Sequence, residues 1–114
     1  MKNPKTVITN FFSSIKADDY DGFYNELQLT YAEKADSKKK FESLKEVFGS
    51  YKEIREINEY DSGKIRKDFH VTFVTKDSAL VTVKLRLVSE TAPFTVDEDG
   101  LWGINPNSIR LAVL

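Results

Sequence analysis

The sequence predicts an α+β domain: three N-terminal helices packed on a curved antiparallel sheet of four to six strands. Apolar residues in the first half of the chain are spaced three and four apart, as on one face of a helix. In the second half, residues 68–89 alternate apolar and polar side chains with period two, which is typical of strands with one buried face. Helices that precede all strands pack together on the sheet, which gives the α+β class.

Composition limits the size of the domain and the classes of partner. A chain of 114 residues suits one domain that buries roughly two-thirds of its unfolded surface. A net charge of −1 gives no global field for nucleic acid or an anionic membrane, and no apolar run is long enough to cross a bilayer. The absence of cysteine excludes disulfides and thiol chemistry. The opening MKNPKT lacks the apolar stretch of a signal peptide, which favours the cytoplasm unless the chain is an excised part of an exported protein.

The first helix is expected to begin at Asn3 and to end near Ala17. Asn is a favoured N-cap, and Pro4 at the first helical position loses no hydrogen bond by lacking an N–H. A single apolar stripe follows, formed by Ile8, Phe11, Phe12 and Ile15. A second, shorter helix is capped by Asp18 or Asp19, and its apolar residues Phe23 and Leu27 point inward. Residues 28–35 stay ambiguous between a loop and a frayed helix.

The third helix is expected to begin at Asp36 or Ser37 and to stop at Gly49. Its apolar stripe consists of Phe41, Leu44, Val47 and Phe48. Three lysines crowd the first turn, where positive charge is unfavourable: Lys38, Lys39 and Lys40. Either they contact phosphate or an acidic partner, or they extend into solvent while Glu42 offsets them, and we favour the second interpretation.

Strands are expected at residues 51–60, 65–75, 79–89, 94–97 and 101–104, with a short final one at 109–114. Ile54 and Ile57 have opposite parity in the first strand, which predicts a bulge or a partly exposed edge. Asn105-Pro106-Asn107 is expected to interrupt the end of the sheet.

Parity predicts the register between the two long strands. A three-residue loop, Lys76-Asp77-Ser78, is the shortest that keeps the apolar residues of both strands on one face. The buried pairs are then Phe73 with Val81, Val71 with Val83, and Phe69 with Leu85. The solvated pairs are Asp68 with Arg86, His70 with Lys84, and Thr72 with Thr82.

The last hairpin allows two loops. A two-residue Asp99-Gly100 turn would split the aromatic residues between the two faces of the sheet. A three-residue loop, Glu98-Asp99-Gly100, pairs Val96 with Trp102 and Phe94 with Ile104. It also places Gly100 where a left-handed residue is wanted, so we favour the longer loop.

Two stretches of the sequence have a familiar form. VITNFFSSIKADDYDGFYNEL joins an aromatic-rich helix to a short helix through an Asp-Asp break, and TVDEDGLWGI places an acidic-Gly turn before a Trp strand. In these stretches and in the order of its elements, the chain resembles the nuclear-transport-factor-like proteins of the cystatin-like superfamily, above all small bacterial members of unknown function. The resemblance implies one domain over residues 1–114, whose curved sheet wraps the first helix and leaves a pocket at the wide end of a cone. Members include enzymes and non-catalytic binders, so the fold does not choose the activity.

We expect no catalytic residues, no metal and no cofactor. His70 is the only histidine and lies on the solvated face, which disfavours a metal site. The resemblance implies that isomerases of this fold need a carboxylate base in an apolar pocket. The register places Asp68 and Asp97 away from the buried face, so the interior is short of ionisable groups. The acidic turn Asp97–Asp99 is expected to be an ordinary solvated turn, because a calcium loop needs a denser set of oxygen ligands.

Two sets of residues are candidates for binding. Four aromatic residues have the amphipathic character of a pocket rim: Tyr20, Tyr24, Tyr31 and Trp102. Three apolar residues fall on the otherwise polar face of the sheet, where they would form a patch for a partner: Val74, Leu80 and Val88. These sets predict a non-catalytic small domain that binds a partner protein or a small apolar ligand, or that forms a homodimer. The alternatives are an isomerase- or dehydratase-type enzyme and an accessory domain of a bacterial surface or secretion assembly.

Overall fold

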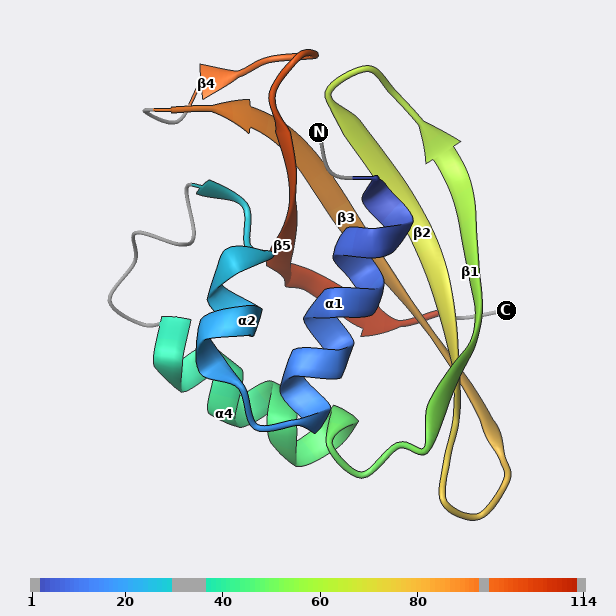
Figure 1. Ribbon diagram of the computed structural model, residues 1–114. Coiled ribbons are helices and arrows are strands. Elements are labelled where there is room, and N and C mark those ends of the chain that lie inside the picture. The colour runs from blue at the N-terminus through green and yellow to red at the C-terminus, as the bar shows by residue number, and fades with distance from the viewer. Residues whose placement is uncertain (1–2, 30–36, 93–94, 113–114) are drawn as a thin grey trace.

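The computed structural model describes residues 3–29, 37–92 and 95–112, and within these ranges three helices pack against a five-stranded antiparallel sheet (Figure 1). The helices are α1 (Pro4–Lys16), α2 (Tyr20–Asn25) and α4 (Ser37–Phe48). The strands are β1 (Glu53–Ser62), β2 (Arg66–Val74), β3 (Leu80–Thr91), β4 (Thr95–Val96) and β5 (Leu101–Leu111). The predicted α+β class is confirmed. We call the face of the sheet that packs on the helices the inner face, and the opposite one the outer face.

The two N-terminal helices begin where their caps predict. The Asn3 side chain accepts a hydrogen bond from the Lys5 N–H at 2.8 Å, and α1 ends at the Ala17 C-cap. Of the two aspartates that were candidates for the second cap, Asp19 is the one, since it accepts from the Gly22 N–H at 3.0 Å. Asp18 instead has a φ of 58° in the turn between the helices, a left-handed conformation that Asp tolerates.

One prediction for α4 is wrong. Phe41 and Phe48 are buried and Leu44 packs against the core, but Val47 is 48% exposed. At 3.6 residues per turn, Val47 lies roughly a quarter turn away from the stripe formed by the other three, so it faces solvent. The candidate cap Asp36 lies outside the described residues.

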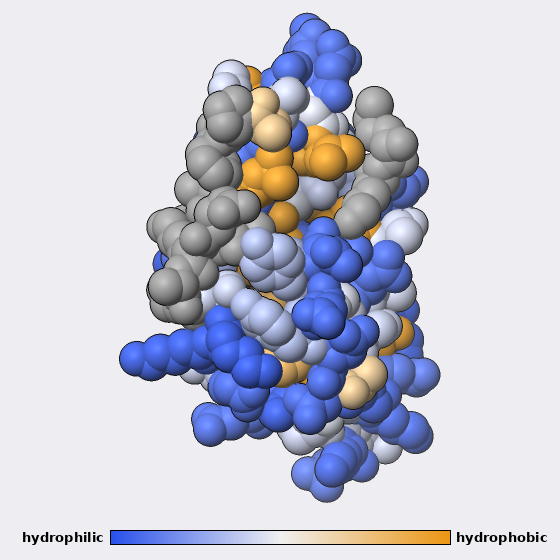
Figure 2. Space-filling model, turned by 60° about the vertical axis from the view of Figure 1, so that its left-hand side comes forward, coloured by the Kyte–Doolittle hydropathy of each residue, from blue (hydrophilic) through white to orange (hydrophobic). Residues whose placement is uncertain are grey.

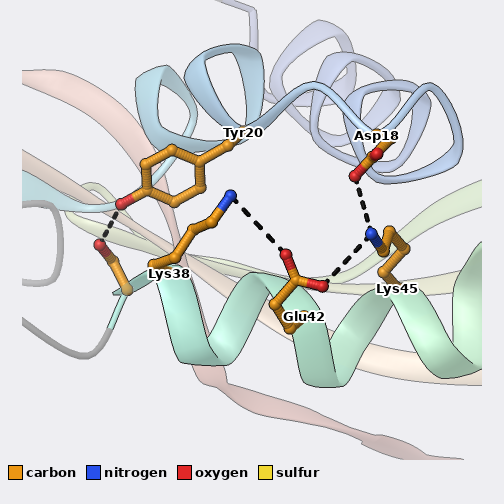
Figure 3. A network of polar contacts seen from close by, with 6 residues as sticks. Asp18, Tyr20, Lys38, Glu42 and Lys45 are labelled. Atoms are coloured by element: carbon orange, nitrogen blue, oxygen red, sulfur yellow. Dashed lines mark hydrogen bonds and ion pairs between the residues drawn. The ribbon is translucent and has the colours of Figure 1, made fainter.

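The α1–α2 turn is joined to α4 by a polar network on the molecular surface (Figure 3). Lys45 Nζ lies 2.8 Å from Asp18 Oδ1 and 3.2 Å from Glu42 Oε2, and Glu42 also lies 3.6 Å from Lys38 Nζ. The hydrogen bond from Lys45 holds the pKa of Asp18 below its ordinary value. Glu42 therefore offsets Lys38, as expected from the sequence, and these exposed pairs contribute little to stability.

The β2–β3 hairpin has the predicted register at every pair. Phe73 lies opposite Val81 and His70 opposite Lys84, with Lys76-Asp77-Ser78 as the loop. The Thr75 N–H donates to the Ala79 carbonyl at 2.9 Å, and Ser78 has a φ of 66°. A three-residue hairpin loop places a left-handed residue in this position. The bulge and the edge position predicted for the first strand are also confirmed, because β2 is the one described strand that pairs with β1 and the register between them shifts twice.

The predicted last hairpin is wrong. β4 pairs with β3 and not with β5, so that Val96 lies opposite Glu90, while Trp102 pairs with Ser89 from the other side of β3. The reason is that β3 runs beyond the start of β2 and offers β4 a free edge. Gly100 does not adopt a left-handed conformation. The chain passes across β3 there, and a Cβ on Gly100 would lie 2.5 Å from the Glu90 carbonyl oxygen. Phe94 lies outside the described residues.

β5 is one strand with a wide bulge, where two strands separated by Asn105-Pro106-Asn107 were expected. Asn105 pairs with Arg86 and Arg110 pairs with Lys84, so residues 106–109 lie opposite the single residue Leu85. Ser108 fixes this bulge, because its hydroxyl donates to the Asn105 carbonyl at 2.6 Å and accepts from the Arg86 N–H at 2.8 Å. A bulge of this kind changes the direction of the side chains that follow it.

The core lies between α1 and the inner face of the sheet. Phe11, Ile8 and Ile15 of α1 are fully buried, together with Phe69 and Val71 of β2. Aromatic rings fill the ends of this layer, for example Phe12 against Phe73 at 4.8 Å and Phe23 against Phe41 at 5.1 Å between centroids. No helix in the described part of the chain is long and apolar enough to span a membrane.

Candidate functional site

The residues predicted to line a pocket do not meet in one place. Tyr20 and Tyr24 are neighbours in α2, with ring centroids 6.1 Å apart, and the Tyr20 hydroxyl lies 2.5 Å from Ser37 Oγ in α4 (Figure 3). Trp102 is 8% exposed in β5, where its ring faces the Lys67 ammonium at 5.4 Å. Tyr31 lies outside the described residues. Tyr20 therefore completes the packing of α2 against α4, and no ring contact among the described residues links it to Trp102.

The residues predicted to form a partner patch are also separated. Val74 and Leu80 face each other across the β2–β3 hairpin, but Val88 lies eight residues further along β3, roughly 26 Å away at 3.3 Å per residue. Leu80 is 58% exposed, whereas Val74 is 4% exposed, which corrects its predicted exposure. Val74 lies outside the main hydrophobic cluster and between Glu53 and Leu80 in the register.

Two other places on the surface show apolar character. A groove of about 360 Å³ between α1 and the start of β1 has the nearly buried rings of Phe12, Phe48 and Phe73 as its floor. On the face shown in Figure 2 hydrophilic colour predominates, and hydrophobic colour gathers in the upper part. Val96 and Leu101 are both about half exposed and both lie opposite Glu90 in the register.

The outer face of the sheet gathers charged side chains in an unusual order. The register places Asn58, His70, Lys84 and Arg110 side by side in one cross-strand row. Lys84 and Arg110 are thus directly opposite each other, and like charges in this position destabilise a sheet. Neither forms an ion pair with any residue in the described ranges. The bulge in β5 creates this juxtaposition, because without it a different residue would face Lys84.

The neighbouring row contains a fixed ion pair. Arg86 Nε lies 2.8 Å from Asp68 Oδ1, and a terminal nitrogen of Arg86 lies 3.4 Å from Asp68 Oδ2. The hydrogen bond that Arg86 donates to the Asp68 carboxylate raises the pKa of Arg86 above its ordinary value. The predicted pairing is confirmed, but the Asp68 side chain is only 9% exposed and not solvated as expected.

An aromatic stack completes this part of the outer face. The rings of Tyr60 and His70 are stacked at 4.2 Å with an angle of 25° between their planes. Burial raises the pKa of the Tyr60 phenol, which therefore stays protonated at neutral pH. Beside the stack lies a hollow of about 170 Å³ whose polar lining is Tyr60, Asp68, Lys84, Arg86, Ser108 and Arg110. Three cations against one carboxylate leave this lining with a formal charge of +2.

The opposite edge of the outer face is acidic. The register places three exposed carboxylates of β1 on the outer face, because Glu53, Glu56 and Asp61 lie opposite Val74, Thr72 and Asp68; Glu59 lies opposite the inner-face residue Phe69. Glu59 pairs with Lys67 at 3.2 Å, whereas Glu56 and Asp61 form no ion pair with residues that the structure describes. The outer face is therefore divided into an acidic edge at β1 and a basic half at β3 and β5.

Sequence reasoning missed two buried carboxylates. Glu26 is 5% exposed after α2, and Glu90 is 2% exposed where β3 pairs with both β4 and β5. The expectation of an interior short of ionisable groups is corrected by these two residues. Glu90 gave no signal because the third strand was expected to end before it. No group of three or more possible metal ligands occurs within residues 3–29, 37–92 and 95–112.

Comparison of the chain with protein-family models, with curated proteins and with solved structures finds no match.

Proposed function

We propose that this protein is a non-catalytic binding domain that associates with a second copy of itself through the outer face of its sheet. The observation that supports the proposal best is the division of that face into an acidic β1 edge and a basic half at β3 and β5. Membership in the nuclear-transport-factor-like group is part of the same proposal. Its support is the order of the elements, with three helices first and packed on an antiparallel sheet.

The two halves of the outer face are complementary under a twofold axis. An axis that runs along the strands between β2 and β3 places β1 of one copy over β5 of the other, which is an isologous arrangement. Glu56 and Asp61 of one copy then approach Lys84 and Arg110 of the other. Tyr60, which is 50% exposed, comes from β1 and stacks its ring on His70 of β2, and tyrosine is a common anchor of protein interfaces.

The size of the face predicts a weak dimer. Four strands about 4.8 Å apart and about eight residues long give roughly 500 Å² per copy, or roughly 1,000 Å² for both copies. This is the lower end of the range for specific interfaces. Because much of the complementarity comes from exposed charges, salt should weaken the association.

The test measures molar mass by light scattering and sedimentation at rising protein concentration, first at low salt and then at high salt. We expect a concentration-dependent dimer that high salt dissociates. The variant Lys84→Glu/Arg110→Glu should remain monomeric at the same concentrations, because both copies would then present acidic groups on both halves of the face. The matched control, Lys39→Glu/Lys40→Glu, makes the same change of charge in α4 and should dimerise like the unmodified chain. A monomer at every concentration and at low salt would refute the proposal.

An isomerase- or dehydratase-type enzyme is the second candidate. The observation in its favour is the burial of Glu26 and Glu90, because such reactions need a carboxylate base in a dry environment. Incubation with a panel of enolisable ketones in deuterated water, followed by NMR, would detect proton abstraction. Exchange that disappears in Glu26→Gln or Glu90→Gln would support an enzyme, and no exchange with any ketone would count against it.

A further inference from the structure

We infer that the hollow beside the Tyr60–His70 stack is a receptor for a single oxyanion, either a carboxylate or a phosphate group. The inference rests on the proposed function in one respect only: in the dimer, the oxyanion is the carboxylate of Glu56 or Asp61 from the second copy. The hollow should also bind a free oxyanion when no second copy is present.

The first argument is the unfavourable charge arrangement of the lining. Lys84 and Arg110 face each other across β3 and β5 with no acid in their cross-strand row, and the bulge of residues 106–109 is what brings them together. A bound oxyanion converts this repulsion into two charge-assisted hydrogen bonds. An anion in the hollow would therefore offset the repulsion between Lys84 and Arg110.

The second argument is that Asp68 holds Arg86 in place while some N–H donors of the guanidinium remain without a hydrogen bond to Asp68. Its guanidinium has five N–H groups, and its two hydrogen bonds to Asp68 use two of them. Asp68 is the one negative group in the lining, and Arg86 neutralises it directly. The remaining donors belong to a group whose orientation is already fixed, so little side-chain entropy is lost when an anion binds.

The third argument concerns the walls and the size of the hollow. The Ser108 hydroxyl donates its proton to the Asn105 carbonyl, so it forms part of the wall but has no proton left to donate to an anion. The Tyr60 phenol on the other side is a neutral O–H donor. A volume of about 170 Å³ equals roughly five to six water volumes in the liquid, which accommodates a carboxylate or phosphate group. Drug-sized ligands and nucleotides need roughly 300 Å³ or more.

The test uses the variant Glu56→Lys/Asp61→Lys, in which a second copy cannot supply a carboxylate. Sodium acetate and sodium phosphate are titrated separately at constant ionic strength, with chloride as the balancing ion, and the Arg86 Nε–H and the amides of residues 84–86 and 108–110 are followed by ¹⁵N NMR. We expect saturable shifts at these signals. Arg110→Gln and Lys84→Gln are then introduced one at a time into this variant. Each should weaken the binding of acetate and phosphate about tenfold, as expected when one charge-assisted hydrogen bond is lost. Lys39→Gln/Lys40→Gln should leave the affinity unchanged.

The unmodified chain separates the two sources of oxyanion. If a second copy fills the hollow, the same signals should shift with protein concentration alone, and phosphate should lower the dimer fraction. Non-saturable or absent shifts in Glu56→Lys/Asp61→Lys would overturn the inference, even if the unmodified chain dimerises. Saturable shifts in a chain that never dimerises would leave the receptor standing and refute only the proposed dimer. Arg86 itself is left unchanged in these experiments, because its loss would also leave the Asp68 carboxylate without its counter-ion and so change two charges of the lining at once.

Discussion

The inner and outer faces of the sheet are built from the same strands but are ordered by different forces. On the inner face, Phe69, Val71 and Leu85 are almost completely buried, and apolar burial alone decides their direction. On the outer face, His70, Lys84 and Arg86 stay partly exposed, so the hydrophobic effect leaves their identities free. The comparison teaches that the inner face specifies the fold, whereas the charge pattern of the outer face is available for function. Substitutions on the inner face should therefore cost more stability than substitutions on the outer face.

Phe11→Ala should cause the largest loss of stability. Phe11 is fully buried and its ring contacts Phe12 and Phe23 at 4.9 and 5.1 Å, so the variant would leave a cavity in the core. We expect the free energy of unfolding to fall by about 3–5 kcal/mol. Urea denaturation followed by circular dichroism measures the loss. A fall below about 1 kcal/mol would mean that this end of the core is loosely packed.

Gly100→Ala tests the passage of the chain across β3. The added Cβ would meet the backbone of Glu90 at 2.5–2.9 Å, so one of the two segments would have to shift. We expect a loss of about 1–3 kcal/mol in the free energy of unfolding, as for overpacking elsewhere. Retention of full stability would contradict the close contact and would favour the β4–β5 hairpin that was expected from the sequence.

Arg86→Met tests the ion pair under the outer face. The Asp68 carboxylate is nearly buried and would lose its counter-ion, while the Arg86 side chain is 42% exposed, which reduces the cost. We expect a loss of about 1–2 kcal/mol. The double variant Asp68→Asn/Arg86→Met is the matched control and should recover part of the loss, because no buried charge remains. Equal stability of the single and double variants would contradict the coupling.

Leu80→Ser should have the smallest effect. Leu80 is 58% exposed at the end of the β2–β3 hairpin and lies four residues along β3 from Lys84. We expect a change in the free energy of unfolding within about 0.5 kcal/mol and an unchanged dimer fraction. A large fall in the dimer fraction would move the interface from the charged centre of the outer face to the apolar hairpin.

The parts of the fold that follow from local rules could be predicted from the sequence. The cap at Asn3 depends on adjacent residues, and the pairing of Phe73 with Val81 depends only on parity and loop length. The pairing of Val96 could not be predicted, because it depends on how far β3 extends beyond β2, which is decided in space. The cross-strand row that contains Lys84 and Arg110 could be predicted only in part, for the same reason. His70 opposite Lys84 follows from parity, but Arg110 reaches Lys84 only through a bulge whose width no sequence pattern indicates.

The most direct test of the proposed dimer is a mixture of two charge-reversed variants that are each expected to be monomeric. Lys84→Glu/Arg110→Glu makes both halves of the outer face acidic, and Glu56→Lys/Asp61→Lys makes both halves basic. Analytical ultracentrifugation of the equimolar mixture at low salt should show a heterodimer that is tighter than the dimer of the unmodified chain and that dissociates at high salt. If both variants remained monomeric in the mixture, this would contradict the claim that the outer face is an interface between copies of this chain.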